Sequence, residues 1–218
     1  MNSLRSWQGI AVSLIVLAGA LGLLLLFLPS EKTLGPVVKT VFLHGALVQV
    51  GLLTFLAAGA CGFVYLLRRR ARAYAWCAAL QKTAILVWIA YVASSMLATY
   101  QAWGQWIAWD EPRVRASYHV LWFSIVALLL ARWVDDRRFT AGINIVVAAI
   151  TWYLIKGSSL VRHPFDPIGE STSTIYRWFF IAMLAVVLLT AVQTARWFRL
   201  RMSQEEGVLQ LGGTTPSS

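Results

Sequence analysis

Hydrophobic residues run along this chain in six long stretches that polar and charged residues separate. A helix that crosses a bilayer needs roughly 20 mostly apolar residues, and these stretches approach or reach that length. The predicted spans are residues 7–28, 41–67, 83–99, 116–133, 139–155 and 176–197. The pattern therefore predicts an all-α polytopic membrane protein with six transmembrane helices.

Charged residues near the ends of some spans leave their limits open. The third span begins a turn or more earlier, near Tyr74, if Lys82 faces inward or snorkels to the interface. The fourth and fifth spans have only about 16–17 uncharged residues, so we expect the flanking Arg132, Arg138 and Lys156 to snorkel. The first apolar run is longer than that of a signal peptide and no clear cleavage site follows, so it counts as a span.

After the last span the chain changes character. Residues 203–218 are polar and end in a segment that contains Gly212, Gly213 and Pro216. Such a composition cannot bury enough apolar surface to order itself. We therefore expect one transmembrane domain over residues 1–202 and a disordered tail over 203–218.

Composition supports the membrane assignment. Of the 218 residues, 59% are hydrophobic and 13% charged, and the mean hydropathy is +0.66. Soluble domains usually have about 45–50% apolar and about 25% charged residues. The composition therefore excludes an ordinary water-soluble globular protein.

The net charge of +10 follows from where the arginines lie. Most of them fall on one side of the predicted spans: Arg5, Arg68, Arg69, Arg70, Arg72, Arg132, Arg137, Arg138, Arg196, Arg199 and Arg201. Because basic residues mark cytoplasmic loops, both termini should be cytoplasmic, with residues 29–38, 99–115 and 156–175 outside. No loop is long enough to fold into a basic surface for nucleic acid, so no nucleic-acid partner is expected.

The residues that serve enzymes and covalent cofactors are sparse. Cys61 and Cys77 form neither a CxxC nor a CxxCH pattern, so we interpret them as packing residues. The chain has no phosphate-binding loop and no Ser/His/Asp arrangement. We therefore expect a protein that is not an enzyme.

Tryptophans concentrate in one predicted outer loop. Three of the eleven, Trp103, Trp106 and Trp109, fall within seven residues, and Asp110 follows directly. An interfacial aromatic belt is one explanation, although belt tryptophans are usually scattered singly at helix ends. The other is a flat apolar platform for a large planar ligand.

The histidines strengthen the second explanation. His44, His119 and His163 all fall at the outer side of the predicted spans. Ionisable residues at spans are functional candidates, and imidazole is a haem-iron ligand. Zinc is disfavoured because no Cys or carboxylate lies near His44 in the sequence to complete a tetrahedral site.

Several of these features occur together in one known family. The string Trp103-Gly-Gln-Trp106-Ile-Ala-Trp109-Asp110 resembles the WWD signature of haem-handling proteins in cytochrome c biogenesis, and the chain is most similar to the six-span CcmC type. The similarity extends over about residues 37–197 and includes Val-Phe-Leu-His44, the Asp135–Arg138 turn and His163. Departures are Ile107 in place of a frequent Trp, and one extra residue after Asp110.

The resemblance implies a function. Haem b would be held non-covalently and transiently by the axial ligands His44 and His163, with the WWD loop, about residues 99–116, as its platform. Haem would then pass to a CcmE-type haem chaperone with the help of CcmA–CcmB-type ABC transporter subunits. The site would lie on the periplasmic face of the bacterial inner membrane.

Other residues have weaker assignments. Arg113, Arg115, Lys156 and Arg162 are candidates for the haem propionates. Asp110 is expected to cap a helix, orient the loop through backbone N–H groups, or contact the chaperone. His119 matches no family ligand, so we interpret it as a structural residue near the site, with direct haem contact as the alternative.

Two other functions are alternatives to haem delivery. An electron-transfer membrane cytochrome b usually pairs histidines on facing helices, often for two haems, but no histidine lies on the inner side here. A structural, non-haem membrane subunit would use the tryptophans as a belt only. Visible spectra separate these functions from haem delivery.

Overall fold

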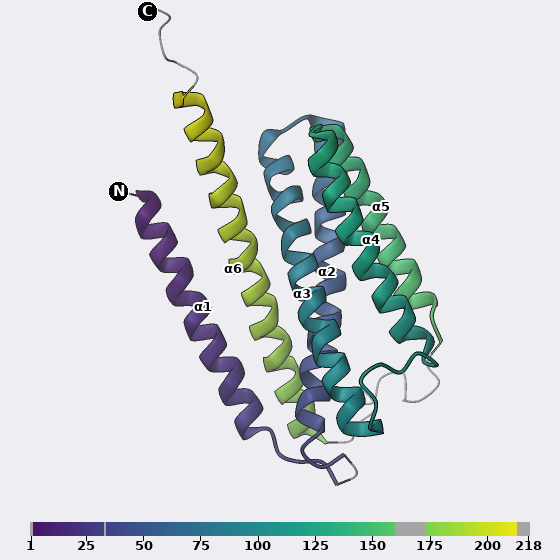
Figure 1. The fold of residues 1–218 in the computed structure, drawn as a ribbon. Coiled ribbons are helices and arrows are strands. Elements are labelled where there is room, and N and C mark those ends of the chain that lie inside the picture. Colours follow the sequence, from purple (N-terminus) through teal and green to yellow (C-terminus); the bar gives the residue numbers. More distant parts are fainter. Residues whose placement is uncertain (1, 33, 160–172, 213–218) are drawn as a thin grey trace, which may run out of the picture.

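The computed structural model describes residues 2–32, 34–159 and 173–212. In this part of the chain six helices run alternately between two ends of a bundle (Figure 1). They are α1 (Asn2–Phe27), α2 (Val38–Arg68), α3 (Ala71–Trp103), α4 (Pro112–Val134), α5 (Arg137–Gly157) and α6 (Thr174–Gly212). All six are long and apolar enough to cross a membrane, which confirms the predicted class of multi-pass helical membrane protein.

Two helices extend beyond their predicted limits. Helix α3 begins at Ala71, close to Tyr74, the earlier of its two predicted starts. The half-buried Lys82 lies inside the helix with its Nζ 5.9 Å from the Phe198 ring centre. Helix α6 continues to Gly212, where disorder was predicted from Ser203 onward.

The two ends of the bundle differ in how their helices are joined. At the end where α1 begins and α6 ends, which we call the terminal end, α2–α3 and α4–α5 are joined by two residues each (Figure 1). Arg69 and Asp135 adopt left-handed backbone conformations there, and the Asp136 carboxylate caps α5 by accepting from Phe139 N at 2.7 Å. The opposite end, the loop end, carries the longer connections, 28–37 and 104–111.

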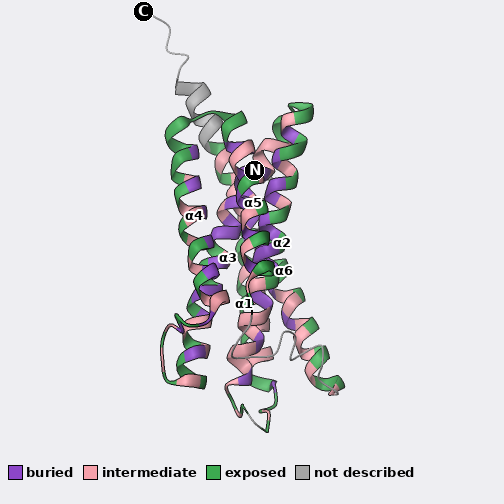
Figure 2. Ribbon diagram, turned by 90° about the vertical axis from the view of Figure 1, so that its right-hand side faces the viewer, coloured by how far each residue is buried: buried purple, intermediate pink, exposed green. Residues whose placement is uncertain are grey.

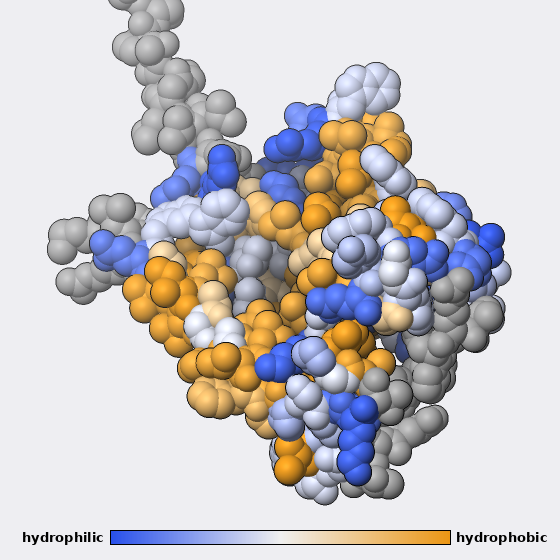
Figure 3. Space-filling model, turned by 60° about the horizontal axis from the view of Figure 1, so that its bottom comes forward, coloured by the Kyte–Doolittle hydropathy of each residue, from blue (hydrophilic) through white to orange (hydrophobic). Residues whose placement is uncertain are grey.

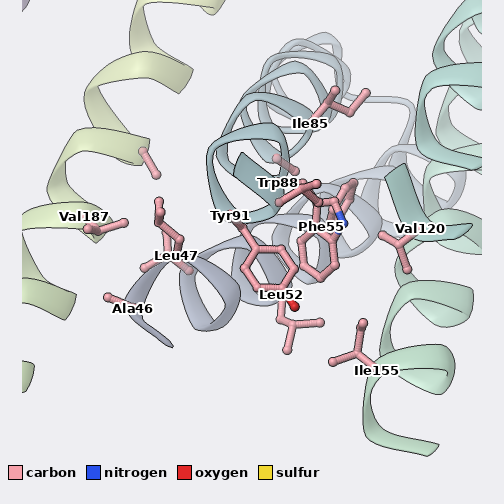
Figure 4. Close-up of a cluster of buried hydrophobic side chains, with 14 of the residues drawn as sticks. Ala46, Leu47, Leu52, Phe55, Ile85, Trp88, Tyr91, Val120, Ile155 and Val187 are labelled. Carbon is pink, nitrogen blue, oxygen red and sulfur yellow. The ribbon is translucent and has the colours of Figure 1, made fainter. Parts of the chain in front are cut away.

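Helix α2 lies at the centre of the bundle and packs against α3, α5 and α6. Its Phe55 meets the buried Trp88 of α3 edge-on, with ring centres 5.7 Å apart. Figure 4 shows these rings with Tyr91 beside side chains of α4, α5 and α6. An aromatic cluster therefore joins the layers of the bundle about midway along α2.

Small residues set the distance between α2 and α5. A Cβ built on Gly59 would lie 2.8 Å from the Ala148 Cβ, and one on Gly62 would lie 2.6 Å from the Ala141 carbonyl oxygen. Such contacts leave no room for a larger side chain. Close approach of backbones through Gly and Ala is a usual way for helices to associate in membranes.

The cysteines belong to this packed region. Cys77 of α3 is fully buried and accepts a hydrogen bond from Asn144 Nδ2 of α5 at 3.0 Å, while Cys61 is half-buried. Both thiols are free. Their surroundings agree with a packing role.

Helices α1 and α6 form the least buried part of the bundle. Figure 2 shows buried residues concentrated along the inner helices, and only 6% of the apolar window of α1 is buried. Helix α1 packs mainly against α6, and Trp7 meets Trp197 edge-on at 6.0 Å. The remaining apolar surface of α1 suits contact with lipid.

Candidate functional site

The tryptophan segment turns at the end of α3. Trp103 is the last residue of that helix, and Gly104 follows with φ +71° while its N–H donates to the Tyr100 carbonyl at 2.9 Å. The left-handed conformation favours glycine, which lets the chain leave the helix sharply. The loop proper is therefore 104–111, shorter than the predicted 99–116, because both helices extend into that range.

Two of the three tryptophans project from the loop. Trp106 is 54% exposed and stacks on Tyr100 with ring centres 4.4 Å apart and planes 13° from parallel. Trp109 is 56% exposed and lies 5.1 Å from the Tyr118 ring, while Trp103 is half-buried. Two large indoles thus lie open at the loop end with aromatic support beneath them.

Hydrogen bonds fix the loop on the bundle. Thr99 Oγ1 donates to the Trp106 carbonyl at 2.8 Å, and Ala108 is completely buried. Glu111 is also buried, and its carbonyl accepts from the N–H groups of Val114 and Arg115 at the start of α4. The exposed indoles therefore project from an anchored loop.

Glu111 was missed as a structural residue by the sequence analysis. It is the N-cap residue of α4, followed by Pro112 in the first turn, and its side chain makes no capping hydrogen bond. The predicted roles of Asp110, which is exposed just before it, stay predictions. A carboxylate near a helix N-terminus is stabilised by the helix dipole. The Glu-Pro pair just before a predicted helix was the available signal.

His44 lies two turns into α2 and faces α3. Its ring stacks on that of Tyr91, with centres 4.9 Å apart and planes 29° from parallel. The residue is half-buried and its Nδ1 atom is buried. One face of the imidazole is therefore covered by an aromatic ring from the neighbouring helix.

Tyr91 links His44 to the beginning of α4. The Tyr91 hydroxyl and Ser117 Oγ are 2.8 Å apart, and Ser117 Oγ also donates to the Arg113 carbonyl at 2.7 Å. Trp88 Nε1 donates to the Ser117 carbonyl at 3.0 Å. This buried network holds the aromatic partner of His44 in one position.

The histidine and the tryptophan loop share α3 as their support. One turn before His44, Thr40 Oγ1 donates to Gln101 Oε1 at 2.8 Å, which ties the start of α2 to the end of α3. Tyr91 precedes Thr99 by eight residues, about 12 Å along a helix. His44 therefore lies below the loop, on the membrane side, at the same end of the bundle.

Arg113, one of the predicted propionate partners, bonds to the end of α5. Its Nη2 donates to the carbonyls of Ile155 (3.1 Å) and Ser158 (3.3 Å), and its Nε donates to Ser158 Oγ at 3.4 Å. The guanidinium thereby satisfies carbonyls at the C-terminus of α5. It joins α4 to α5 at the loop end.

The other predicted cationic partners have different surroundings. Lys156 is exposed, with its Nζ 5.5 Å from the Trp152 ring centre. Arg115 is exposed and lines a cavity of about 320 Å³ between α4 and α5, which His119 also lines. His163 and Arg162 lie outside the described residues.

A second, much smaller cavity lies beneath the tryptophan loop. It measures about 10 Å³, room for about one water molecule, and Thr99, Trp106 and Tyr118 are among its lining residues. Within the described part of the chain the buried Tyr118 hydroxyl has no hydrogen-bond partner. An ordered water in this cavity would satisfy that hydroxyl.

Figure 3 views the molecule with the loop end turned forward. Hydrophilic residues gather over the connections, and hydrophobic residues cover the sides of the bundle.

No family model matches the chain, and no curated protein matches it. The function therefore has to be argued from the site.

The described residues at the loop end offer one candidate metal ligand, His44, and two exposed indoles. Among the described residues no three His, Cys, Asp or Glu side chains gather as a metal site would require. Haem does not need such a group, because its porphyrin supplies four ligands and the protein one or two. His44 and the exposed indoles fit that requirement.

Proposed function

We propose that the protein binds haem b at the loop end and delivers it during cytochrome c biogenesis. The observation that carries the proposal is the placement of His44. It lies at the same end of the bundle as the tryptophan loop, and Tyr91 stacks on its ring. The resemblance to CcmC-type WWD proteins adds support.

His44 would supply a ligand to the haem iron. Because Nδ1 is buried between helices, we assign iron binding to Nε2. The Tyr91 ring would hold the imidazole plane, as groups around metal ligands commonly do. His163 would be the second ligand, on the strength of the family resemblance.

The tryptophans would receive the macrocycle. Indole faces offer a large polarisable apolar surface, and Trp106 and Trp109 are exposed on an anchored loop. Haem bound to such a surface without a covalent bond remains exchangeable. That property suits a protein that passes haem to a CcmE-type chaperone together with CcmA–CcmB-type subunits.

The proposed orientation places the loop end on the periplasmic side of the bacterial inner membrane. Arginines cluster at the terminal end, in the turns at Arg68–Arg70 and at Arg137 and Arg138, and near the end of α6. By the positive-inside rule that end is cytoplasmic. Haem would then be presented where c-type cytochromes are assembled.

Haem content after co-expression with the proposed partner proteins tests the function. The wild-type chain should purify with haem, and a His44→Ala variant should retain about ten-fold less or lower, as expected from loss of an iron ligand. A His119→Ala variant, whose imidazole lines a different region, should keep the wild-type content.

Two results would count against the proposal. A wild-type chain without haem in the presence of its partners excludes haem delivery and favours a structural subunit. Equal haem loss in the two histidine variants removes the special role of His44. Fast reversible electron exchange with a quinol would favour a cytochrome b instead.

A further inference from the structure

The cavity between α4 and α5 is a candidate binding site that the proposed haem function does not use. Arg115 and His119 lie one turn apart on α4 and line it, and Tyr153 and Ser158 contribute from α5 and its end. Its volume of about 320 Å³ lies at the lower end of the range of small-molecule sites. Arg113 fixes its walls by joining α4 to the last carbonyls of α5.

The charge of this cavity favours an anion. Among its described lining residues Arg115 carries a permanent positive charge, and no Asp or Glu is present. His119 offers an N–H donor whether its imidazole is neutral or protonated. Guanidinium groups bind phosphate oxygens in a bidentate manner.

The apolar surface of α4 beside the cavity indicates which kind of anion would bind there. Arg115 and His119 are followed on the same face of α4, at spacings of three or four residues, by exposed apolar side chains. These are Trp122 (63% exposed), Val126 (49%), Leu129 (59%) and Trp133 (84%). The 23 residues of α4 extend about 35 Å, enough to cross the hydrocarbon core.

A soluble phosphate compound would contact the cationic cavity but not the row of exposed apolar side chains on α4. A phospholipid would use both, with its headgroup at the level of the exposed Trp106 and Trp109 and its acyl chains along α4. Basic pockets between transmembrane helices are known to bind anionic headgroups. We propose that this cavity binds the phosphate group of an anionic phospholipid through Arg115 and His119.

The proposal stands apart from the haem function, and native mass spectrometry of the detergent-purified full chain tests it. Bound phosphatidylglycerol is counted as the lipid is titrated in, with phosphatidylcholine and inorganic phosphate as comparison probes. We expect the Arg115→Gln/His119→Gln variant to bind phosphatidylglycerol about ten-fold more weakly, since charge-assisted hydrogen bonds are lost. The Arg132→Gln control loses one charge at the terminal end of α4 and should bind as the wild type does.

Four outcomes would overturn the proposal. The first is a double variant that binds phosphatidylglycerol with wild-type affinity, and the second is an Arg132→Gln variant that binds it as weakly as the double variant does. The third is displacement of the lipid by inorganic phosphate, which would make the ligand soluble. The fourth is a double variant that keeps the lipid but loses haem, which would assign the two side chains to the propionates. Arg115 and His119 are both exposed, so the fold should survive their substitution, and the thermal midpoint checks this.

Discussion

Tyr91 is the residue on which the position of the His44 ring depends. It stacks on the imidazole and binds Ser117 through its hydroxyl, so the two interactions can be removed separately. Tyr91→Leu removes the stacking ring, and we expect haem affinity to fall about ten-fold, as for other groups that orient metal ligands. Tyr91→Phe keeps the ring and should lose less.

Haem titration of the purified variants, followed at the Soret band, measures this difference. The position and width of that band report the ligand field, which a loss of general stability would leave unchanged in the remaining bound fraction. If Tyr91→Leu and Tyr91→Phe bind haem equally, the stacked ring does not position His44.

Gly62 illustrates a residue whose role is purely steric. Its substitution by Ala would bring a Cβ to 2.6 Å from the Ala141 carbonyl and 3.3 Å from Cys77 Sγ, so α2 and α5 must move apart. We expect Gly62→Ala to destabilise the protein by about 1–3 kcal/mol, the usual range for overpacking. The matched control is Gly142→Ala on α5, where a Cβ meets nothing within 4 Å and the helix gains about 0.5–1 kcal/mol.

Thermal unfolding in detergent compares the two glycine variants. A lower midpoint for Gly62→Ala and an unchanged or higher one for Gly142→Ala is expected. Equal midpoints would mean that α2 and α5 are not in close contact at Gly62.

The roles of single residues were harder to predict from the sequence than the helices were. The three loop tryptophans and His44 were selected as candidates because they are rare residues in an unusual place. Tyr91 and Ser117 were missed because their roles depend on contacts between helices, 26 residues apart in the chain, that no local pattern encodes. Arg113 was one of four propionate candidates, chosen for its charge, and its bond to the Ile155 carbonyl of α5 was not predictable from the chain.

At the loop end, the contact between helices α4 and α5 depends on one side chain. Arg113 donates to two carbonyls and one hydroxyl at the C-terminus of α5. We expect Arg113→Gln to destabilise the bundle by about 1–2 kcal/mol, less than fully buried charge-assisted bonds because the site is partly exposed.

Hydrogen exchange of amides near the end of α5 localises the effect of Arg113→Gln. Exchange should accelerate at Ile155–Ser158 while α2 remains protected, and Arg132→Gln should change neither. Uniform acceleration throughout the bundle would show that Arg113 supports the fold as a whole rather than this joint.

The existence of the six helices was predictable from hydropathy, but their ends were not. Helix α3 extends to Ala71, and Lys82 within it lies against Phe198, a contact that depends on the neighbouring helix. The tryptophan loop shrinks to 104–111 because α3 continues to Trp103 and α4 begins at Pro112. Apolar length alone cannot locate ends at which helices extend past the hydrocarbon region.

For the whole molecule, the arrangement of charges predicts one orientation in the membrane. A single cysteine introduced as Ser159→Cys at the loop end, or as Ser203→Cys at the terminal end, reports it in a chain with Cys61→Ala and Cys77→Ala. Both serines are exposed. A membrane-impermeant maleimide applied to spheroplasts should label Ser159→Cys directly and Ser203→Cys only after permeabilisation. Labelling in the reverse order would place the loop end in the cytoplasm.

The architecture as a whole explains why function is assigned to one end. The terminal end is closed by two short turns, whereas the loop end carries the long connections, the exposed indoles, His44 and the cavity at His119. The sequence predicted this asymmetry through its histidines and tryptophans. The cavity was not predictable, because its walls come from α4 and α5 only after they pack.

Ligation of haem iron by His44 is the central claim, and chemical rescue tests it most directly. A His44→Gly variant should lose the Soret absorption of the wild type, and added imidazole should restore it by occupying the vacated ligand position. His119→Gly should keep the wild-type spectrum without imidazole. A His44→Gly variant that retains the wild-type spectrum, or that imidazole fails to restore, would contradict the claim.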